Sequence, residues 1–191
     1  DYKGVKNMVQ AAVESGIDFN DPKKNYKVPD NEKPKPSVQK IILLSSVGVT
    51  NPDKQKYTNA LENFLQGNSL KEKLKWKFDG EEELRKSSIE YVVVRAGKLD
   101  EPDGYSRGIE VGTGDRWDVS NSYVSRVDAA AAVVQSLTQD VGNITFEVRN
   151  TKEIRRSPGY LDERDMKTIA LQSLEQDAEE EKYWQDLLNS L

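Results

Sequence analysis

Two short apolar runs stand out against the polar background of the chain. One contains Ile41 to Leu44 and the other contains Tyr91 to Val94, and polar residues bound both runs. A continuous aliphatic run of this length is typical of a parallel strand that helices cover on both faces. We therefore predict strands at residues 40–45 and 90–95, with a last strand at residues 144–148.

Apolar residues recur at helical spacing between these strands. The helices predicted from this spacing cover residues 2–14, 55–66, 69–86 and 126–137. We expect Gly67 to end the second helix, Gly80 to weaken the third, and either Ser125 or Asp128 to open the fourth. Residues 100–122 are rich in Gly, Asp and Ser and indicate a loop with room for one short strand. The alternation of helices and strands predicts an α/β fold with a parallel, helix-covered sheet.

Two segments depart from this alternation. Residues 21–36 hold four of the seven prolines and five lysines, a composition that disfavours helix and sheet, so we interpret residues 17–37 as a surface insertion. Beyond residue 150, apolar positions at helical spacing are interrupted by acidic residues between 175 and 186. We predict one α/β domain at residues 1–150, followed by an acidic amphipathic helical arm at residues 151–191.

The composition excludes several classes of chemistry. The 191 residues include no Cys and no His, so disulfides, zinc sites, thiol nucleophiles and imidazole bases are absent from this chain. With 28 basic and 33 acidic residues, the net charge of −5 argues against nucleic acid as a partner. The apolar runs are too short for a membrane span. We interpret the acidic runs at 81–83 and 179–181 as solvated helix faces and expect no metal site.

The ends of the two predicted strands are the candidate site. In an open parallel sheet, ligands bind beyond the carboxyl ends of the strands. One strand ends in Ser45-Ser46 and the other continues into Ala96-Gly97-Lys98. Ser and Gly are also ordinary turn residues, so spacing alone leaves a plain turn equally open.

Five segments in the same order resemble a known family. They are residues 1–12 (DYKGVKNMVQAA), 41–48 (IILLSSVG), 76–88 (WKFDGEEELRKSS), 91–99 (YVVVRAGKL) and 124–130 (VSRVDAA). Together they resemble the carboxyl-terminal half of the atypical short-chain dehydrogenase/reductases, the NmrA-like NAD(P)H-binding proteins, and the plant members most closely. The resemblance implies a Rossmann-like fold, an oxidoreductase-like function and NADP as cofactor, with NAD as the other choice.

The resemblance also implies which residues meet the cofactor. Lys77 matches the helix lysine that reaches the nicotinamide ribose, and Ser45 and Ser46 match the serine at the strand exit. Arg95, Ala96, Gly97, Lys98 and Leu99 match the loop that passes the nicotinamide. Lys77 and Ser46 are accordingly the candidate catalytic residues.

The sequence also differs from the family pattern. The family's glycine-rich phosphate loop is expected before residue 1, and we interpret Gly112-Thr113-Gly114 as a turn or substrate-side loop. Lys73 stands four positions before Lys77, where a Tyr-x-x-x-Lys pair would have its proton donor. Tyr105 or Tyr123 are possible substitutes, although packing is the more ordinary role of such residues.

Three functions therefore stay open: an NAD(P)-dependent oxidoreductase, a non-catalytic structural or assembly subunit, and an NADP-responsive redox sensor. Without Met at residue 1 and with no signal peptide in view, we expect the natural N-terminus to lie upstream. We expect a protein partner to bind through residues 161–191, and a location in the plastid stroma or the cytoplasm.

We interpret Arg126 and Asp128 as structural residues at a helix start. We interpret the three tryptophans, at positions 76, 117 and 184, as packing residues.

Overall fold

The computed structural model describes residues 2–14, 38–56, 60–100 and 107–154. The predicted insertion, most of the predicted arm, Tyr105 and Trp184 lie outside these ranges. The main elements in chain order are α1 (Tyr2–Glu14), β1 (Lys40–Ser46), α2 (Ala60–Arg85), β2 (Glu90–Ala96), β3 (Lys98–Asp100), β4 (Arg107–Gly112), β5 (Tyr123–Ser125), α3 (Arg126–Thr138) and β6 (Ile144–Ile154).

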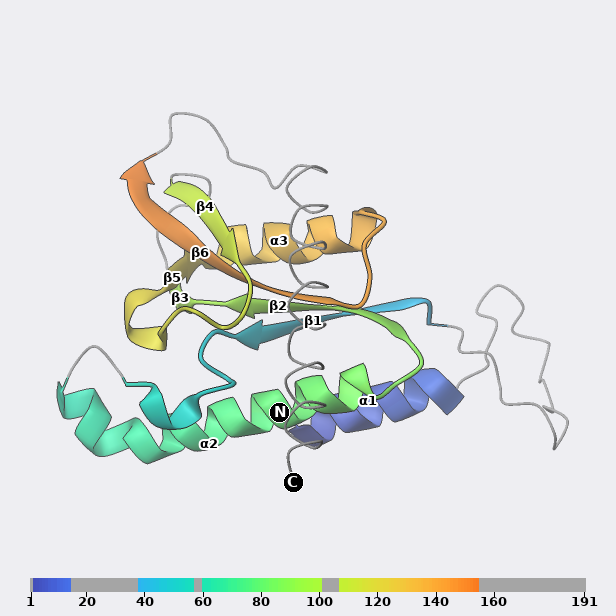
Figure 1. Ribbon diagram of the computed structural model, residues 1–191, viewed down its shortest axis with the longest axis horizontal. Helices are drawn as coiled ribbons and strands as arrows, with labels where there is room; N and C mark the ends of the chain where they lie inside the picture. Colours follow the sequence, from blue (N-terminus) through green and yellow to red (C-terminus); the bar gives the residue numbers. More distant parts are fainter. Residues whose placement is uncertain (1, 15–37, 57–59, 101–106, 155–191) are drawn as a thin grey trace, which may run out of the picture.

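The central sheet has four strands in the order β1-β2-β6-β4 (Figure 1). β1, β2 and β6 run parallel, and β4 pairs antiparallel with β6 at the edge. The α/β fold is confirmed, and the prediction of a wholly parallel sheet is wrong only at β4; an antiparallel edge strand is common on an otherwise parallel sheet. β3 and β5 form a separate two-stranded parallel sheet.

Helices cover both faces of the central sheet (Figure 1). Val92 and Val94 of β2 pack with Phe146 of β6 in the core under α3. Val93 belongs to a second core, which includes Leu84 of α2 together with residues of α1. Successive side chains of a strand point to opposite faces. Burial on both faces therefore explains why β2 is aliphatic throughout and shows no alternation.

The two predicted central helices form one continuous helix, α2. The prediction that Gly67 ends a helix is wrong, because a glycine inside a helix costs about 1 kcal/mol relative to alanine and does not by itself stop the helix. Gly80 lies within the same helix, where a Cβ atom would be 3.2 Å from Val5 Cγ2 of α1. Glycine at this position lets α1 and α2 approach closely.

The remaining predicted elements differ only at their ends. Ser125 is the N-cap of α3, and its Oγ accepts a hydrogen bond from the Asp128 backbone N–H at 3.0 Å. Asp128 then accepts from Ser125 Oγ at 2.7 Å and from Asn150 Nδ2 at 2.9 Å, which confirms its structural role. β6 extends to Ile154 instead of ending at residue 148, because its distal half pairs with β4.

Candidate functional site

The two strand ends singled out in the sequence are neighbours in the sheet. Ser45 of β1 lies opposite Arg95 of β2, and Ser46 lies opposite Ala96. The Val47 N–H donates to the Ala96 carbonyl at 3.0 Å, which continues the pairing past the end of β1. Both exits therefore face the same edge of the sheet.

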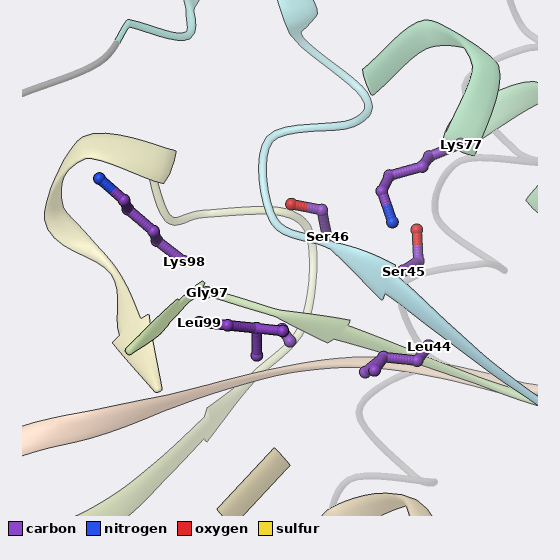
Figure 2. Close-up of a pocket in the computed structure, with 8 residues that line it drawn as sticks. Leu44, Ser45, Ser46, Lys77, Gly97, Lys98 and Leu99 are labelled. Atoms are coloured by element: carbon purple, nitrogen blue, oxygen red, sulfur yellow. The ribbon is translucent and has the colours of Figure 1, made fainter. Parts of the chain in front are cut away.

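A cavity of about 250 Å³ opens at this edge (Figure 2). Its lining consists of Leu44, Ser45, Ser46, Lys77, Ala96, Gly97, Lys98 and Leu99. Every predicted site residue except Arg95 is in this set, and Leu44 was missed. Leu44 is the last aliphatic residue before the strand exit, and 40% of it is exposed, as is 40% of Leu99. The cavity therefore combines polar groups from three elements with two accessible apolar side chains.

Ser45, rather than Ser46, faces Lys77. Figure 2 shows the Ser45 hydroxyl and the Lys77 amine pointing toward one another. Ser45 Oγ is buried and has no hydrogen-bond partner within the described ranges, whereas Ser46 Oγ donates to the Val47 carbonyl at 3.2 Å. Successive strand residues point to opposite faces, and the Ser45 side lies against α2. Ser46 also lines the cavity, but its hydroxyl is bound to the Val47 carbonyl, so Ser45 is the serine that faces Lys77.

Lys77 reaches the cavity from α2 and is half-buried. Burial lowers the pKa of its ammonium group below the usual value, and the carboxylate of Glu81, one turn along the helix, acts in the opposite direction. Lys73 is exposed one turn earlier on the same helix. Lys77 therefore lines the cavity, and the position of the usual tyrosine carries a second lysine.

Arg95 does not line the cavity, and its side chain is bound to Glu81 of α2. Its Nη2 atom donates to Glu81 Oε2 at 2.8 Å, and Glu81 is fully buried. The interpretation of residues 81–83 as a solvated face is therefore wrong for Glu81. Consecutive residues of a helix are about 100° apart, so Glu81 points to a different side of α2 from Glu82 and Glu83. The charged arginine at the end of an aliphatic strand was the available signal for this pair.

The turn between β2 and β3 requires glycine at position 97. A Cβ atom there would lie 2.7 Å from the Ser122 carbonyl oxygen. The next residue, Lys98, donates its backbone N–H to the same oxygen at 2.7 Å. The Lys98 ammonium lies 5.9 Å from the centre of the Tyr123 ring, and Tyr123 does not line the cavity.

Asp115, which sequence reasoning missed, holds the loop that follows β1. Its carboxylate accepts from the Gly48 N–H at 2.5 Å, from the Thr50 N–H at 2.7 Å and from Thr50 Oγ1 at 2.6 Å. Gly114, in the motif interpreted as a turn, has a φ of +85°, and Asp115 has a φ of 51°. A turn at the end of β4 thus fixes the chain beyond the cavity.

The tryptophans divide into two cases within the described ranges. Trp117 packs against the cluster of Val47, Val49 and Leu74, and the Arg149 guanidinium lies 4.2 Å from the centre of its ring. Trp76 is 49% exposed, so the packing role predicted for it is wrong.

No helix in the described part of the chain is long and apolar enough to cross a membrane. No group of three or more acidic side chains there is arranged to hold a metal ion.

A parallel sheet with a cavity where two neighbouring strands end defines the class of Rossmann-like ligand-binding proteins. Residues 32–140 match the NAD(P)H-binding family, and the chain belongs to that family. The family assignment confirms the resemblance to atypical short-chain dehydrogenase/reductases.

Three known proteins illustrate the relationship. Sanguinarine reductase of Eschscholzia californica is 33% identical over 62% of this chain and 41% of its own length. The chloroplastic protein At2g37660 of Arabidopsis thaliana is 29% identical over 72% of this chain and 33% of its own length. A short-chain dehydrogenase/reductase of Veillonella parvula, solved with NADP, shares the fold with a TM-score of 0.52 at 15% identity, over 84% of this chain and 63% of its own. The chain thus spans less than half of the two curated relatives.

The residues present fit one end of a nicotinamide dinucleotide. Ribose hydroxyls need both donors and acceptors, and the cavity offers the Lys77 ammonium and the buried Ser45 hydroxyl without a partner in the described ranges. A flat ring needs close access to the backbone, and Gly97 provides a wall without a side chain. Leu44 and Leu99 supply the apolar surface that such a ring would contact.

Proposed function

We propose that this chain forms the nicotinamide side of the NADP(H) site of a reductase. The observation that carries the proposal is the convergence of Lys77 and Ser45 on one cavity at the carboxyl ends of β1 and β2. Membership of the NAD(P)H-binding family supports a dinucleotide as the ligand. We infer NADP, rather than NAD, because the Veillonella parvula relative was solved with NADP.

The chain's own residues would bind and orient the reacting groups. A bound reduced nicotinamide would supply the hydride. Lys77 would donate N–H bonds to the ribose and place a positive charge beside the substrate oxygen on which negative charge develops. The Ser45 hydroxyl would hold the same oxygen or the ribose by a hydrogen bond. Leu44 and Leu99 would exclude water from the ring.

Titration of the full-length protein with NADPH, followed by the fluorescence of the reduced nicotinamide, tests this proposal. We expect saturable binding, and we expect Lys77→Ala to weaken it about tenfold, as loss of a charged hydrogen bond implies. Lys75→Ala removes an exposed lysine from the same helix and should leave the affinity unchanged. Equal affinities for wild type and Lys77→Ala would remove Lys77 from the site.

A non-catalytic assembly subunit is the second candidate. Lys73, in place of the proton-donating tyrosine, favours it. Absence of NADPH binding to the folded full-length protein would support this candidate and overturn the first. The redox-sensor alternative requires NADP binding without substrate turnover. The same titration combined with a reductase assay distinguishes a sensor from a reductase.

We infer a plastid location from the chloroplastic relative in Arabidopsis thaliana. Microscopy of the fluorescently tagged full-length protein would check it.

The partner-binding role of residues 161–191 stays a prediction of the sequence. Deletion of that segment should leave the α/β domain folded and abolish partner binding.

A further inference from the structure

A buried charge cluster lies directly behind the cavity, between α2 and the ends of the strands. At its centre is Glu81, whose side chain is fully buried. Arg95 of β2 approaches it with Nη2 at 2.8 Å from Oε2 and with Nε at 3.3 Å from both oxygens. Arg85 of α2 adds a fourth guanidinium contact, from Nη2 to Oε2 at 3.0 Å. Both arginines therefore contact this one carboxylate.

Arg85 has further hydrogen-bond partners besides Glu81, and Arg95 is held by its place in β2. Arg85 also donates to Glu82 Oε1 at 2.8 Å and to Thr145 Oγ1 of β6 at 2.9 Å. Arg95 lies in β2, one residue before Ala96, which lines the cavity. The carboxylate of Glu81 is consequently held in one place by α2, β2 and, through Arg85, β6.

Lys77 precedes Glu81 by four residues, so the two side chains lie on the same face of α2. The charged group that acts on Lys77 is Glu81. Lys98 of β3 lines the same cavity, but its ammonium lies toward the Tyr123 ring and points away from Lys77 (Figure 2). Arg85 and Arg95 lie behind Glu81. Removal of the Glu81 charge would leave Lys77 beside buried cations, with Glu82 bound to Arg85 as the remaining acidic neighbour in the cluster.

We propose that Glu81 is a positioning residue for the cavity: its carboxylate, locked between Arg95 and Arg85 one helical turn from Lys77, is the counter-charge for the Lys77 ammonium. This role deepens the proposed NADP(H) site and rests on it. The buried pair also joins the helix that carries Lys77 to the strand that carries Ala96 and Gly97. A ligand-free reactivity measurement separates the charge effect from this joining role.

The experiment measures the rate at which Lys77 of the full-length protein is acylated by acetic anhydride, by mass spectrometry, across a range of pH without ligand. Glu81→Gln should lower the pH of half-maximal labelling by about one unit, because a neighbouring opposite charge shifts a pKa by that order. Glu81→Asp, which keeps the charge, should restore most of the wild-type profile. Glu82→Gln, at the adjacent, partly exposed carboxylate, is the matched control and should leave the Lys77 profile in place.

Loss of one partner of a buried ion pair can prevent folding. If Glu81→Gln does not fold, Glu81→Gln combined with Arg95→Gln removes both charges together. A smaller downward shift is then expected, because loss of the Arg95 cation partly offsets loss of the carboxylate. An unchanged Lys77 profile in the folded variant overturns the inference, because a purely structural link would not alter the charge state of Lys77.

NADPH titration of the same variants distinguishes this inference from the proposed function. Weaker binding by Glu81→Gln at pH above the shifted midpoint, with recovery at lower pH, supports both. A shifted Lys77 profile in a protein that does not bind NADPH contradicts the proposed function and leaves the charge-setting role of Glu81 standing.

Discussion

Glu147 is a buried carboxyl group at this edge of the sheet. It lies in β6 directly opposite Arg95, and its Oε1 accepts from the Arg116 N–H at 3.2 Å. Its Oε2 atom has no hydrogen-bond partner within the described ranges. Burial, and then the nearby charge of Asp115, raise the pKa of this carboxyl. Burial therefore disfavours the charged form of Glu147 in the folded protein, while Glu81 takes the arginine contacts.

Replacement of Glu147 by Gln should change how stability depends on pH. The folded state binds the Glu147 proton more tightly than the unfolded state, so stability falls as pH rises from the unfolded pKa through the raised folded pKa. Glutamine preserves the Oε1 acceptor and removes this titration. Urea unfolding between about pH 4.5 and 8 should show a smaller loss of stability with rising pH in Glu147→Gln than in wild type. Exposed Glu72→Gln should retain the wild-type slope, and an equal slope in Glu147→Gln would contradict this account.

At the scale of elements, the site arises where β1 and β2 end and their connections diverge. Asp115 fixes the loop after β1, and the Ser122 carbonyl fixes the turn after β2. These two polar anchors come from segments far along the chain. Neither Asp115 nor Ser122 is among the residues that line the cavity, so both fix the neighbouring turns from outside it.

Gly97→Ala should test the second anchor. The added Cβ would lie 2.7 Å from the Ser122 carbonyl oxygen, so the backbone has to shift. We expect a loss of about 1–3 kcal/mol in the free energy of unfolding, as for overpacked sites, together with weaker NADPH binding. Calorimetry and the NADPH titration measure the two effects. An unchanged melting temperature and affinity would show that the turn is not tightly constrained.

The sequence predicted β1, β2 and the first part of β6, together with the edge of the sheet that holds the cavity, for two reasons. A strand buried on both faces needs a continuous aliphatic run, and ligands meet parallel strands at their carboxyl ends. Local pattern did not predict that α2 continues through Gly67, because packing along a helix outweighs the propensity of one residue. Nor did it show that Ser45 rather than Ser46 faces Lys77, or that Glu81 is buried, since both depend on which face of the sheet α2 covers.

At the scale of the whole molecule, the described ranges supply a helix-covered sheet with a cavity suited to one end of a dinucleotide. The NAD(P)H-binding family assignment and the geometry of the strand ends agree on that ligand class. Reductase activity is the further step that we propose, since this chain spans 41% of sanguinarine reductase and 33% of the Arabidopsis relative.

A crystal structure of the full-length protein with NADPH would test the central claim most directly. The account predicts the nicotinamide ribose within hydrogen-bonding distance of Lys77 Nζ, with the ring against the backbone of Gly97 and the Ser45 hydroxyl turned toward the ligand. A nicotinamide bound elsewhere, with the cavity between β1 and β2 left to solvent, would contradict it.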